Sequence, residues 1–290
     1  MRPIATMEGT KAILKRYPFV FKKKFGQNFL IDQNILNEII EAAEIDQGDC
    51  ILEIGPGIGC VTQALLKEAG KVVAVEIDKL LIPILEDNFR DFSNFRLIHN
   101  DVLKVNLHEL LQEEAQGKRI KVVANLPYYI TTPIIMMLLE ERLPIETITV
   151  MVQKEVALRM HAEPGTKQYG AITVALNYYA SSHLVTDVPR DCFMPSPNVD
   201  SAVIQLQLHK EPPVTVEDER MLFRLVKAAF SQRRKTLLNT LFSQGELGLS
   251  KDEIKQILED SGIGSSTRGE TLSLEEFARL ANIISHYKKS

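Results

Sequence analysis

Several features are missing from this 290-residue sequence, and each absence excludes a class of protein. No apolar run approaches the roughly 18 residues that a membrane-spanning helix needs, and the N-terminus lacks the apolar core of a signal peptide. The three cysteines, Cys50, Cys60 and Cys192, form no C-x-x-C pair, and the six histidines show no ligand spacing. We therefore expect a cytoplasmic protein with reduced thiols, no membrane segment and no metal site.

The net charge of −4 does not suggest a nucleic-acid partner, but the cations are unevenly distributed. Residues 1–30 carry seven Lys or Arg and one acid, and residues 221–240 carry five and no acid. One basic run is most often only a solvated face, whereas two such runs flanking a neutral-to-acidic core favour binding of phosphates. We predict that RNA contacts involve six of these cations: Lys22, Lys23, Lys24, Arg233, Arg234 and Lys235.

The middle of the chain alternates apolar runs with helical spacing, which predicts a parallel, doubly wound α/β sheet. The expected parallel strands are 50–54, 71–76, 95–99, 120–124 and 145–152. Runs at 183–188 and 201–208 predict an antiparallel edge pair, and 171–179 favours a helix. Pro212 and Pro213 mark a break, after which only amphipathic stretches follow. We expect a basic arm over 1–24, a sheet domain over 25–210 and a small helical domain over 211–290.

A glycine-rich turn follows the first of these strands, at the position where open α/β sheets bind nucleotide-type cofactors. Gly55, Gly57 and Gly59 are spaced G-x-G-x-G, unlike the G-x-G-x-x-G that holds a pyrophosphate, and Glu53 precedes them. An acid beside the turn is unfavourable for phosphate and favourable for a cation. The turn therefore suits S-adenosylmethionine, which carries a sulfonium and an ammonium group, although a tight turn without a ligand has the same glycines.

Acidic residues end the next two strands. Glu76 lies about twenty residues after the glycines, where a carboxylate accepts hydrogen bonds from ribose hydroxyls. Asp78 competes for that role but is better explained as a helix cap. Asp101 ends the third strand and is placed to accept from an adenine amine, and a plain turn residue is its alternative.

The sequence Asn125-Leu126-Pro127-Tyr128 ends the fourth strand. Asn125 supplies an amide, Pro127 leaves the Leu126 carbonyl free in an extended backbone, and Tyr128 supplies a face on which a base can stack. Two acceptors beside a ring suit an exocyclic amine on an aromatic base. A strand that ends in a proline turn is the alternative, and we expect Tyr129 only to pack.

Taken together, these motifs resemble the rRNA adenine dimethylase family, and most closely its members that act on small-subunit ribosomal RNA. The resemblance covers nearly the whole chain after the basic arm. It rests on Glu76, Asp101 and the segments 25–30, 53–59, 125–128, 193–201 and 230–237. The tail 267–277 and the order Phe25-Gly26-Gln27-Asn28 favour the small-subunit group over the antibiotic-resistance enzymes that act on large-subunit RNA.

The resemblance implies an S-adenosylmethionine-dependent enzyme that makes N6,N6-dimethyladenosine at two adjacent adenosines near the 3′ end of 16S rRNA. It implies that the cofactor contacts Asn28, Leu30, Gly55, Gly57, Glu76, Asp101 and Asn125. It further implies that residues 25–210 form the methyltransferase domain and 211–290 an RNA-binding domain, that the partner is small-subunit rRNA within a pre-30S particle, and that the protein takes part in small-subunit biogenesis. We expect a monomer.

Three other functions stay open at this point, as does the role of Phe193. The alternatives are a large-subunit rRNA dimethyltransferase, a non-catalytic assembly factor with this fold, and a small-molecule methyltransferase. The last would leave the two basic segments without a purpose. Phe193 could stack on the target base opposite Tyr128, or it could be a hydrophobic plug beneath the Pro-rich loop that follows it.

Overall fold

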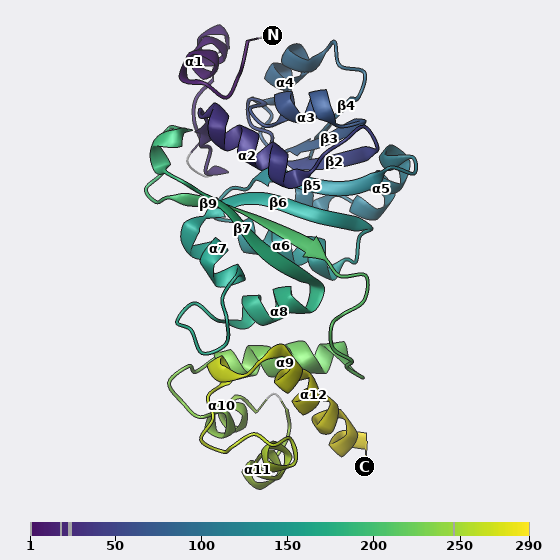
Figure 1. Cartoon of the computed structure of the whole chain (residues 1–290), viewed down its shortest axis with the longest axis vertical. Coiled ribbons are helices and arrows are strands. Elements are labelled where there is room, and N and C mark those ends of the chain that lie inside the picture. The colour runs from purple at the N-terminus through teal and green to yellow at the C-terminus, as the bar shows by residue number, and fades with distance from the viewer. Residues whose placement is uncertain (1, 18, 23–24, 246, 290) are drawn as a thin grey trace. The chain divides into compact units, whose positions relative to one another are not determined.

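A seven-stranded sheet organises the N-terminal part of the computed structural model, which describes residues 2–17, 19–22, 25–245 and 247–289 (Figure 1). Its strand order is β4-β3-β2-β5-β6-β9-β7. The first five strands are parallel and β9 runs antiparallel to β6. The strands are β2 (Asp49–Ile54), β3 (Lys71–Glu76), β4 (Phe95–His99), β5 (Arg119–Asn125), β6 (Ile145–Gln153), β7 (Ala180–Val188) and β9 (Ser201–Leu208). The predicted α/β fold is confirmed, and β4 and β7 are the two edge strands of the sheet.

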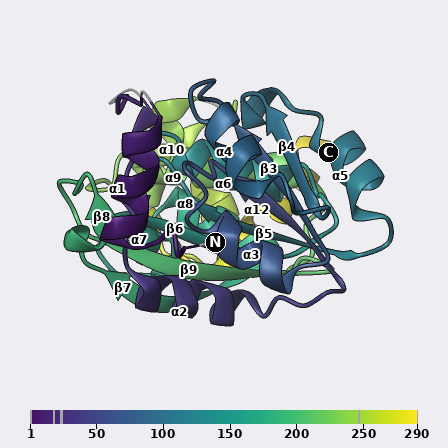
Figure 2. The same ribbon diagram turned by 90° about the horizontal axis from the view of Figure 1, so that it is seen from above.

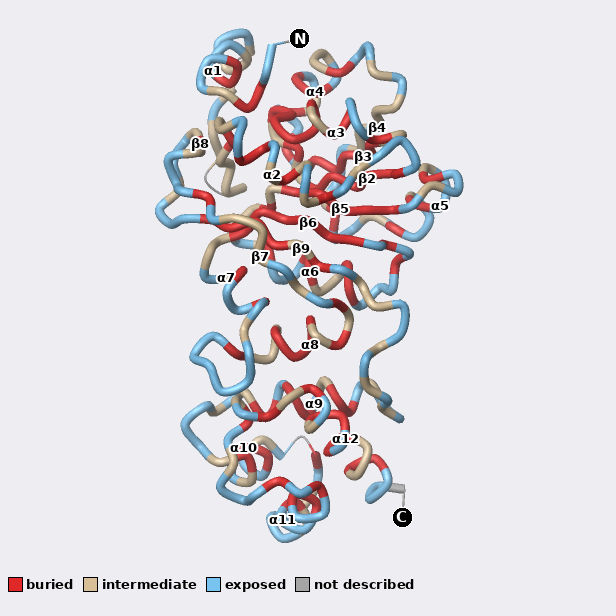
Figure 3. Tube along the Cα trace, in the orientation of Figure 1, coloured by how far each residue is buried: buried red, intermediate tan, exposed pale blue. Residues whose placement is uncertain are grey.

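Burial explains why the inner strands show apolar runs and the outer ones do not. Every residue of β2 is buried, as are five consecutive residues of β3 and of β5, whereas β4 and β7 are only partly covered (Figure 3). Strands with helices on both faces must be apolar on both sides, so they lose the alternation of a half-exposed strand.

Helices cover both faces of this sheet. One apolar cluster packs α2 (Gln33–Ala43), α3 (Thr62–Glu68) and α4 (Ile82–Phe89) against the same face, and α2 and α6 (Thr131–Glu140) lie on opposite sides of the sheet (Figure 2). The helix α5 (Leu107–Ala115) contacts β2, β3 and β5. Asp32 caps α2 through the amides of Asn34 and Ile35, as its sequence position predicts.

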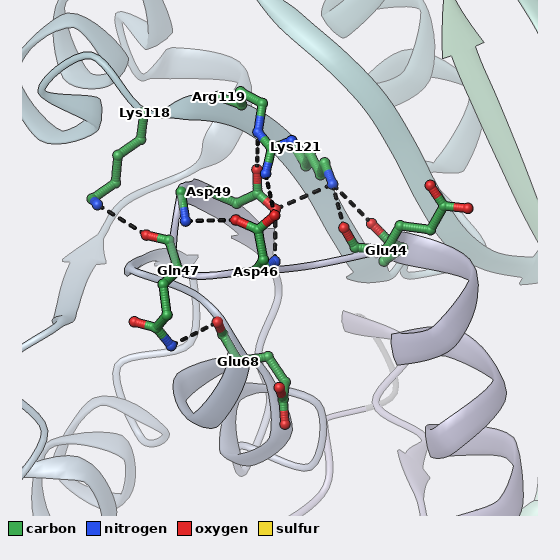
Figure 4. Close-up of polar contacts among 10 residues, drawn as sticks. Glu44, Asp46, Gln47, Asp49, Glu68, Lys118, Arg119 and Lys121 are labelled. Carbon is green, nitrogen blue, oxygen red and sulfur yellow. Dashed lines mark hydrogen bonds and ion pairs between the residues drawn. The ribbon is translucent and has the colours of Figure 1, made fainter.

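The amino ends of β2 and β5 carry a buried ionic network (Figure 4). The Asp49 carboxylate, whose side chain is 0% exposed, lies 2.8 Å from Arg119 Nε and 3.1 Å from Lys121 Nζ. Lys121 also donates to the Glu44 carbonyl at 2.6 Å. Removing one partner of such a pair would leave an uncompensated buried charge. Because Lys121 also bonds to Glu44 at the end of α2, the network joins α2 to the amino ends of the strands, opposite the ends that carry the glycine turn.

The remaining helices form a second compact unit. Contacts divide the chain into one unit of Met1–Ala157 with Ser182–Leu208 and another of Leu158–Ser181 with His209–Ser290. The second unit contains α8 (Ala171–Tyr179), α9 (Glu219–Phe230), α10 (Leu237–Gln244), α11 (Lys251–Asp260) and α12 (Leu274–Lys289), and α7 (Lys154–Met160) spans the boundary. Its apolar cluster includes Val174, Leu225 and Phe277, each at most 1% exposed.

This division differs from the domains predicted from the sequence in two places. Residues 158–181 belong with the C-terminal helices, because the buried face of α8 packs against α9 and α12. The N-terminal segment belongs to the sheet unit: α1 (Met7–Arg16) follows Ile4, which is buried and whose amide donates to Gln63 Oε1 at 2.8 Å. Among the described residues, no helix is both long and apolar enough to cross a bilayer.

Candidate active site

A cleft opens at the carboxyl ends of β2, β3 and β5, where the predicted site residues were expected to meet. Its volume, counted to the open mouth, is about 740 Å³. Nine of the eleven residues predicted to bind cofactor or carry out catalysis line it: Asn28, Leu30, Gly55, Gly57, Glu76, Asn125, Leu126, Pro127 and Tyr128. Asp101 and Phe193 are not among the lining residues.

The floor of the cleft is the glycine turn. Gly57 has φ +61°, a left-handed conformation that favours glycine, and a Cβ there would lie 3.0 Å from the Phe29 ring. A larger residue would therefore be strained and would push Phe29, which belongs to β1 (Phe29–Leu30). The positive φ and the nearby Phe29 ring together favour glycine at position 57.

Glu76 ends β3 with its carboxylate beside this turn. It is 4% exposed and accepts from the Gly57 amide at 3.2 Å and from the Asp78 amide at 2.8 Å. Burial raises the pKa of Glu76 to about 7, against the two amide hydrogen bonds that lower it. Glu76 is therefore mainly a carboxylate, the form that accepts best from a diol, only above about pH 7.

Glu53 lies beneath the turn and is 2% exposed. Thr62 Oγ1 donates to its Oε2 at 2.6 Å. Burial raises the pKa of Glu53 to about 8, and the nearby Glu76 adds to the rise. At pH 7 the folded protein therefore prefers to keep a proton on Glu53.

The raised pKa of Glu53 predicts a pH-dependent stability. The folded state holds the proton up to about pH 8, whereas an unfolded Glu loses it near 4.3. The Glu53 contribution, on the order of 5 kcal/mol, is full below about pH 4 and is lost as the pH rises toward 8. Urea unfolding between pH 5 and 9 should show a steeper decline in the wild type than in Glu53→Gln, which keeps only the decline due to Glu76. Glu113→Gln, at an exposed position on α5, is the matched control, and equal pH slopes for wild type and Glu53→Gln would contradict the prediction.

Asn125 is oriented by the N-terminal segment. Its Nδ2 donates to the Asn28 carbonyl at 3.1 Å, and since a carbonyl can only accept, the amide nitrogen must face Asn28. The Asn125 Oδ1 is thereby turned away from Asn28. No described residue donates to that oxygen or to the Leu126 carbonyl. Two free acceptors therefore remain at the end of β5.

The two tyrosines after Pro127 behave differently. Tyr128 is half-buried and its hydroxyl is hydrogen-bonded to Ser201. Tyr129 is 56% exposed and lines the cleft, so the assignment of Tyr129 to packing is wrong. Its ring lies beside Gly26, where a Cβ would meet Tyr129 Cδ1 at 3.7 Å.

The structure agrees with the alternative interpretations of two residues: Asp101 lies in a turn, and Phe193 packs in the apolar cluster. Asp101 caps the 3₁₀ turn Val102–Lys104 by accepting from the Leu103 amide at 3.1 Å, and its contact with an adenine stays a prediction. Phe193 is 3% exposed and lies in β8 (Phe193–Met194), paired with Leu30 of β1. Stacking by Phe193 would need it to leave the apolar cluster in which it packs.

Asp78 is not a helix cap, because α4 begins only at Ile82 with Pro83 in its first turn. The Asp78 carboxylate instead accepts from Lys22 Nζ at 2.5 Å and Gln27 Nε2 at 2.8 Å. The competing explanation failed because Pro83 delays the helix, which leaves the Asp78 carboxylate to bond to Lys22 and Gln27.

The predicted RNA-binding cations differ in their surroundings. Lys22 pairs with Asp78, and Arg233 pairs with Glu270 at 3.0 Å. Within the described part of the chain, Arg234 and Lys235 show no ion pair. Lys23 and Lys24 lie outside the described residues.

Several other lining residues were not predicted to belong to the site, among them Gln27, Ile77 and Tyr129. Ile77 is 41% exposed directly after Glu76, and an apolar residue at the end of a strand was the available signal. Among the described residues, no three His, Cys, Asp or Glu side chains gather as a metal site.

The fold and the cleft define a Rossmann-like methyltransferase. Comparisons with known proteins narrow this class. The family model for ribosomal RNA adenine dimethylase matches residues 19–283, and the chain belongs to that family.

A relative from Lachnoclostridium phytofermentans named ribosomal RNA small subunit methyltransferase A is 55% identical over 281 residues, which are 97% of each chain. Two solved structures are similar at 26% identity. A dimethyladenosine transferase from Plasmodium falciparum matches with a TM-score of 0.75 over 90% of this chain and 97% of that one. The 23S rRNA methyltransferase ErmE matches with 0.69 over 89% and 100%.

Proposed function

We propose that the protein uses S-adenosylmethionine to methylate N6 of adenosines in small-subunit rRNA, giving N6,N6-dimethyladenosine at two adjacent positions near the 3′ end. The observation that carries the proposal is the pair of free acceptors, Asn125 Oδ1 and the Leu126 carbonyl, on two residues that line the same cleft as the glycine turn. The 55% identity to a small-subunit enzyme, against 26% to the large-subunit enzyme, supports the small subunit as the substrate.

The cleft fits the cofactor on its own chemistry. Glu76, once ionised, places a negative charge among the lining residues for a ligand with cationic groups, and Gly57 holds a left-handed backbone that a residue with a Cβ would strain. Ile77 and Leu81 offer apolar surface beside Glu76. Glu76 would hold the ribose, Asp101 the adenine, and Asn28, Leu30, Gly55, Gly57 and Asn125 the remainder. When bound, the cofactor supplies an electrophilic methyl group on sulfur.

The residues of the chain prepare the adenine amine. Its lone pair is delocalised into the ring, which makes it a poor nucleophile. Hydrogen bonds to Asn125 Oδ1 and the Leu126 carbonyl pull the nitrogen toward tetrahedral geometry and stabilise the positive charge that develops on it. No strong general base is needed, since the alkylated amine is acidic. The base must leave its stack, and a stack on Tyr128 is worth about 1–3 kcal/mol.

The test is incubation with small ribosomal subunits that lack these methyl groups, using labelled S-adenosylmethionine, followed by mapping of the modified bases. Label in dimethyladenosine of the small-subunit rRNA is expected, and fully methylated subunits are the control. Label only in large-subunit rRNA would favour the antibiotic-resistance activity. Tight binding to the subunit with no label would favour a non-catalytic assembly factor.

The helical unit should contribute phosphate contacts. Changing Arg233, Arg234 and Lys235 to Ser should weaken RNA binding and flatten its dependence on salt, with the slope of log affinity against log salt falling by about 2. The expected decrease in slope is smaller than the loss of three phosphate contacts would give, because Arg233 already pairs with Glu270. Filter binding at several salt concentrations measures the slope. The control removes three exposed lysines elsewhere in the unit, Lys251, Lys255 and Lys288, and an unchanged slope in the first variant would assign its charges to a solvated face.

A further inference from the structure

The segment Phe25–Leu30 forms one wall of the cleft. Its C-terminal end is fixed, since Leu30 is 1% exposed and pairs with Phe193 across the β1–β8 ribbon. Among the residues that the structure describes, its N-terminal end enters no such ribbon. Hydrogen bonds and an ion pair made by side chains hold that end in place.

Three side chains make the connection. Gln27 accepts from the Lys22 amide through Oε1 at 2.8 Å and donates through Nε2 to Asp78 Oδ2 at 2.8 Å. Lys22 Nζ reaches Asp78 Oδ1 at 2.5 Å. The Asp78 side chain is 0% exposed and that of Lys22 is 28% exposed, so water screens this ion pair poorly. Both oxygens of Asp78 are thus used to hold the wall.

Each end of this connection reaches a residue that the proposed function needs. Asp78 is two residues from Glu76 and donates its amide to Glu76 Oε1 at 2.8 Å. Asn28 follows Gln27 and accepts from Asn125 Nδ2 at 3.1 Å. A closed wall therefore fixes both the carboxylate assigned to the ribose and the amide assigned to the target base.

We propose that Lys22, Gln27 and Asp78 form a latch that closes the segment 25–30 over the cofactor and, through Asn28, sets the orientation of Asn125. They are positioning residues, and the inference rests on the proposed function. A dimethylating enzyme uses two cofactor molecules for each adenosine. The latch must then open to release spent cofactor and close again before the second transfer. It therefore controls both the rate of cofactor release and the orientation of Asn125.

Cofactor release tests the latch without any RNA. Labelled S-adenosylmethionine is bound and chased with unlabelled cofactor in wild type, Gln27→Leu and Lys22→Met. Both variants should release it at least about tenfold faster, with hydrogen exchange in 25–30 rising to match. Lys22→Arg keeps the charge and should release at close to the wild-type rate. Gln33→Leu, the same change at an exposed position on α2, is the matched control and should have no effect.

A second readout separates the latch from general destabilisation. At saturating cofactor, single-turnover methylation by Gln27→Leu should fall at least about fivefold while its melting temperature stays near that of Gln33→Leu, because Asn125 loses its fixed partner. Release and single-turnover rates within twofold of wild type in both variants would overturn the latch and leave the proposed function standing. Wild-type protein that binds no S-adenosylmethionine would overturn the proposed function and the latch with it.

Discussion

Replacing Asn125 with alanine should lower the single-turnover rate of methyl transfer about 10²- to 10³-fold, the loss typical when one preorganised group facing developing charge is removed. The Leu126 carbonyl alone would then face the amine. Cofactor binding should weaken much less, because most of the cleft wall is contributed by other residues. Rapid-quench assays with rRNA substrate and equilibrium binding of S-adenosylmethionine measure the two effects separately.

Asn125→Asp provides the informative comparison. It keeps an acceptor for the amine but loses the donor that reaches the Asn28 carbonyl, so two oxygens would repel each other across 3.1 Å. We expect its rate to fall between wild type and Asn125→Ala. Asn37→Ala, at an exposed position on α2, serves as the neutral control. A wild-type rate in Asn125→Ala would remove Asn125 from the mechanism.

Cofactor affinity should rise with pH through about 7 because of Glu76. Below its raised pKa of about 7 the group is protonated, and a carboxylic acid offers fewer acceptor sites to a ribose diol than a carboxylate does. Affinity should therefore be highest above pH 7 and decline on acidification, by up to tenfold for each pH unit. Isothermal titration between pH 5.5 and 8.5 follows this change.

Glu76→Gln should lose this pH dependence and bind the cofactor about 10- to 100-fold more weakly at pH 8, the loss expected when hydrogen bonds to a charged acceptor become neutral ones. Glu113→Gln on the surface of α5 should keep the wild-type profile. If the affinity of Glu76→Gln for the cofactor still rises through pH 7, a group other than Glu76 causes the pH dependence.

The strands and the residues at their ends were predictable because one rule places them. Buried parallel strands read as apolar runs, and their carboxyl ends share one edge, so Gly55, Glu76 and Asn125 had to meet once the runs were recognised. The rule holds although 70 residues separate Gly55 from Asn125 in the sequence. The helices of the C-terminal unit followed equally from their amphipathic spacing.

Local pattern could not decide what each remaining side chain faces. Tyr128 and Tyr129 are adjacent and chemically identical, yet one is bonded to Ser201 and the other lies at the mouth of the cleft. Asp78 was interpreted as a cap although Pro83 already predicted a late start of the helix, and α4 does begin only at Ile82. Its true partners, Lys22 and Gln27, lie 56 and 51 residues away in sequence, and only the fold brings them together.

The discontinuous composition of the helical unit limits how the protein can be divided. Tyr169 is 1% exposed, its hydroxyl donates to the Leu272 carbonyl at 2.8 Å, and its ring packs on Phe230. A chain ended near residue 210 would keep Tyr169 and α8 but lose every one of these partners, which would expose the apolar face of α8. Exchange of the helical unit between relatives must therefore carry two segments together, and a single crossover at the proline pair would produce a mismatched core.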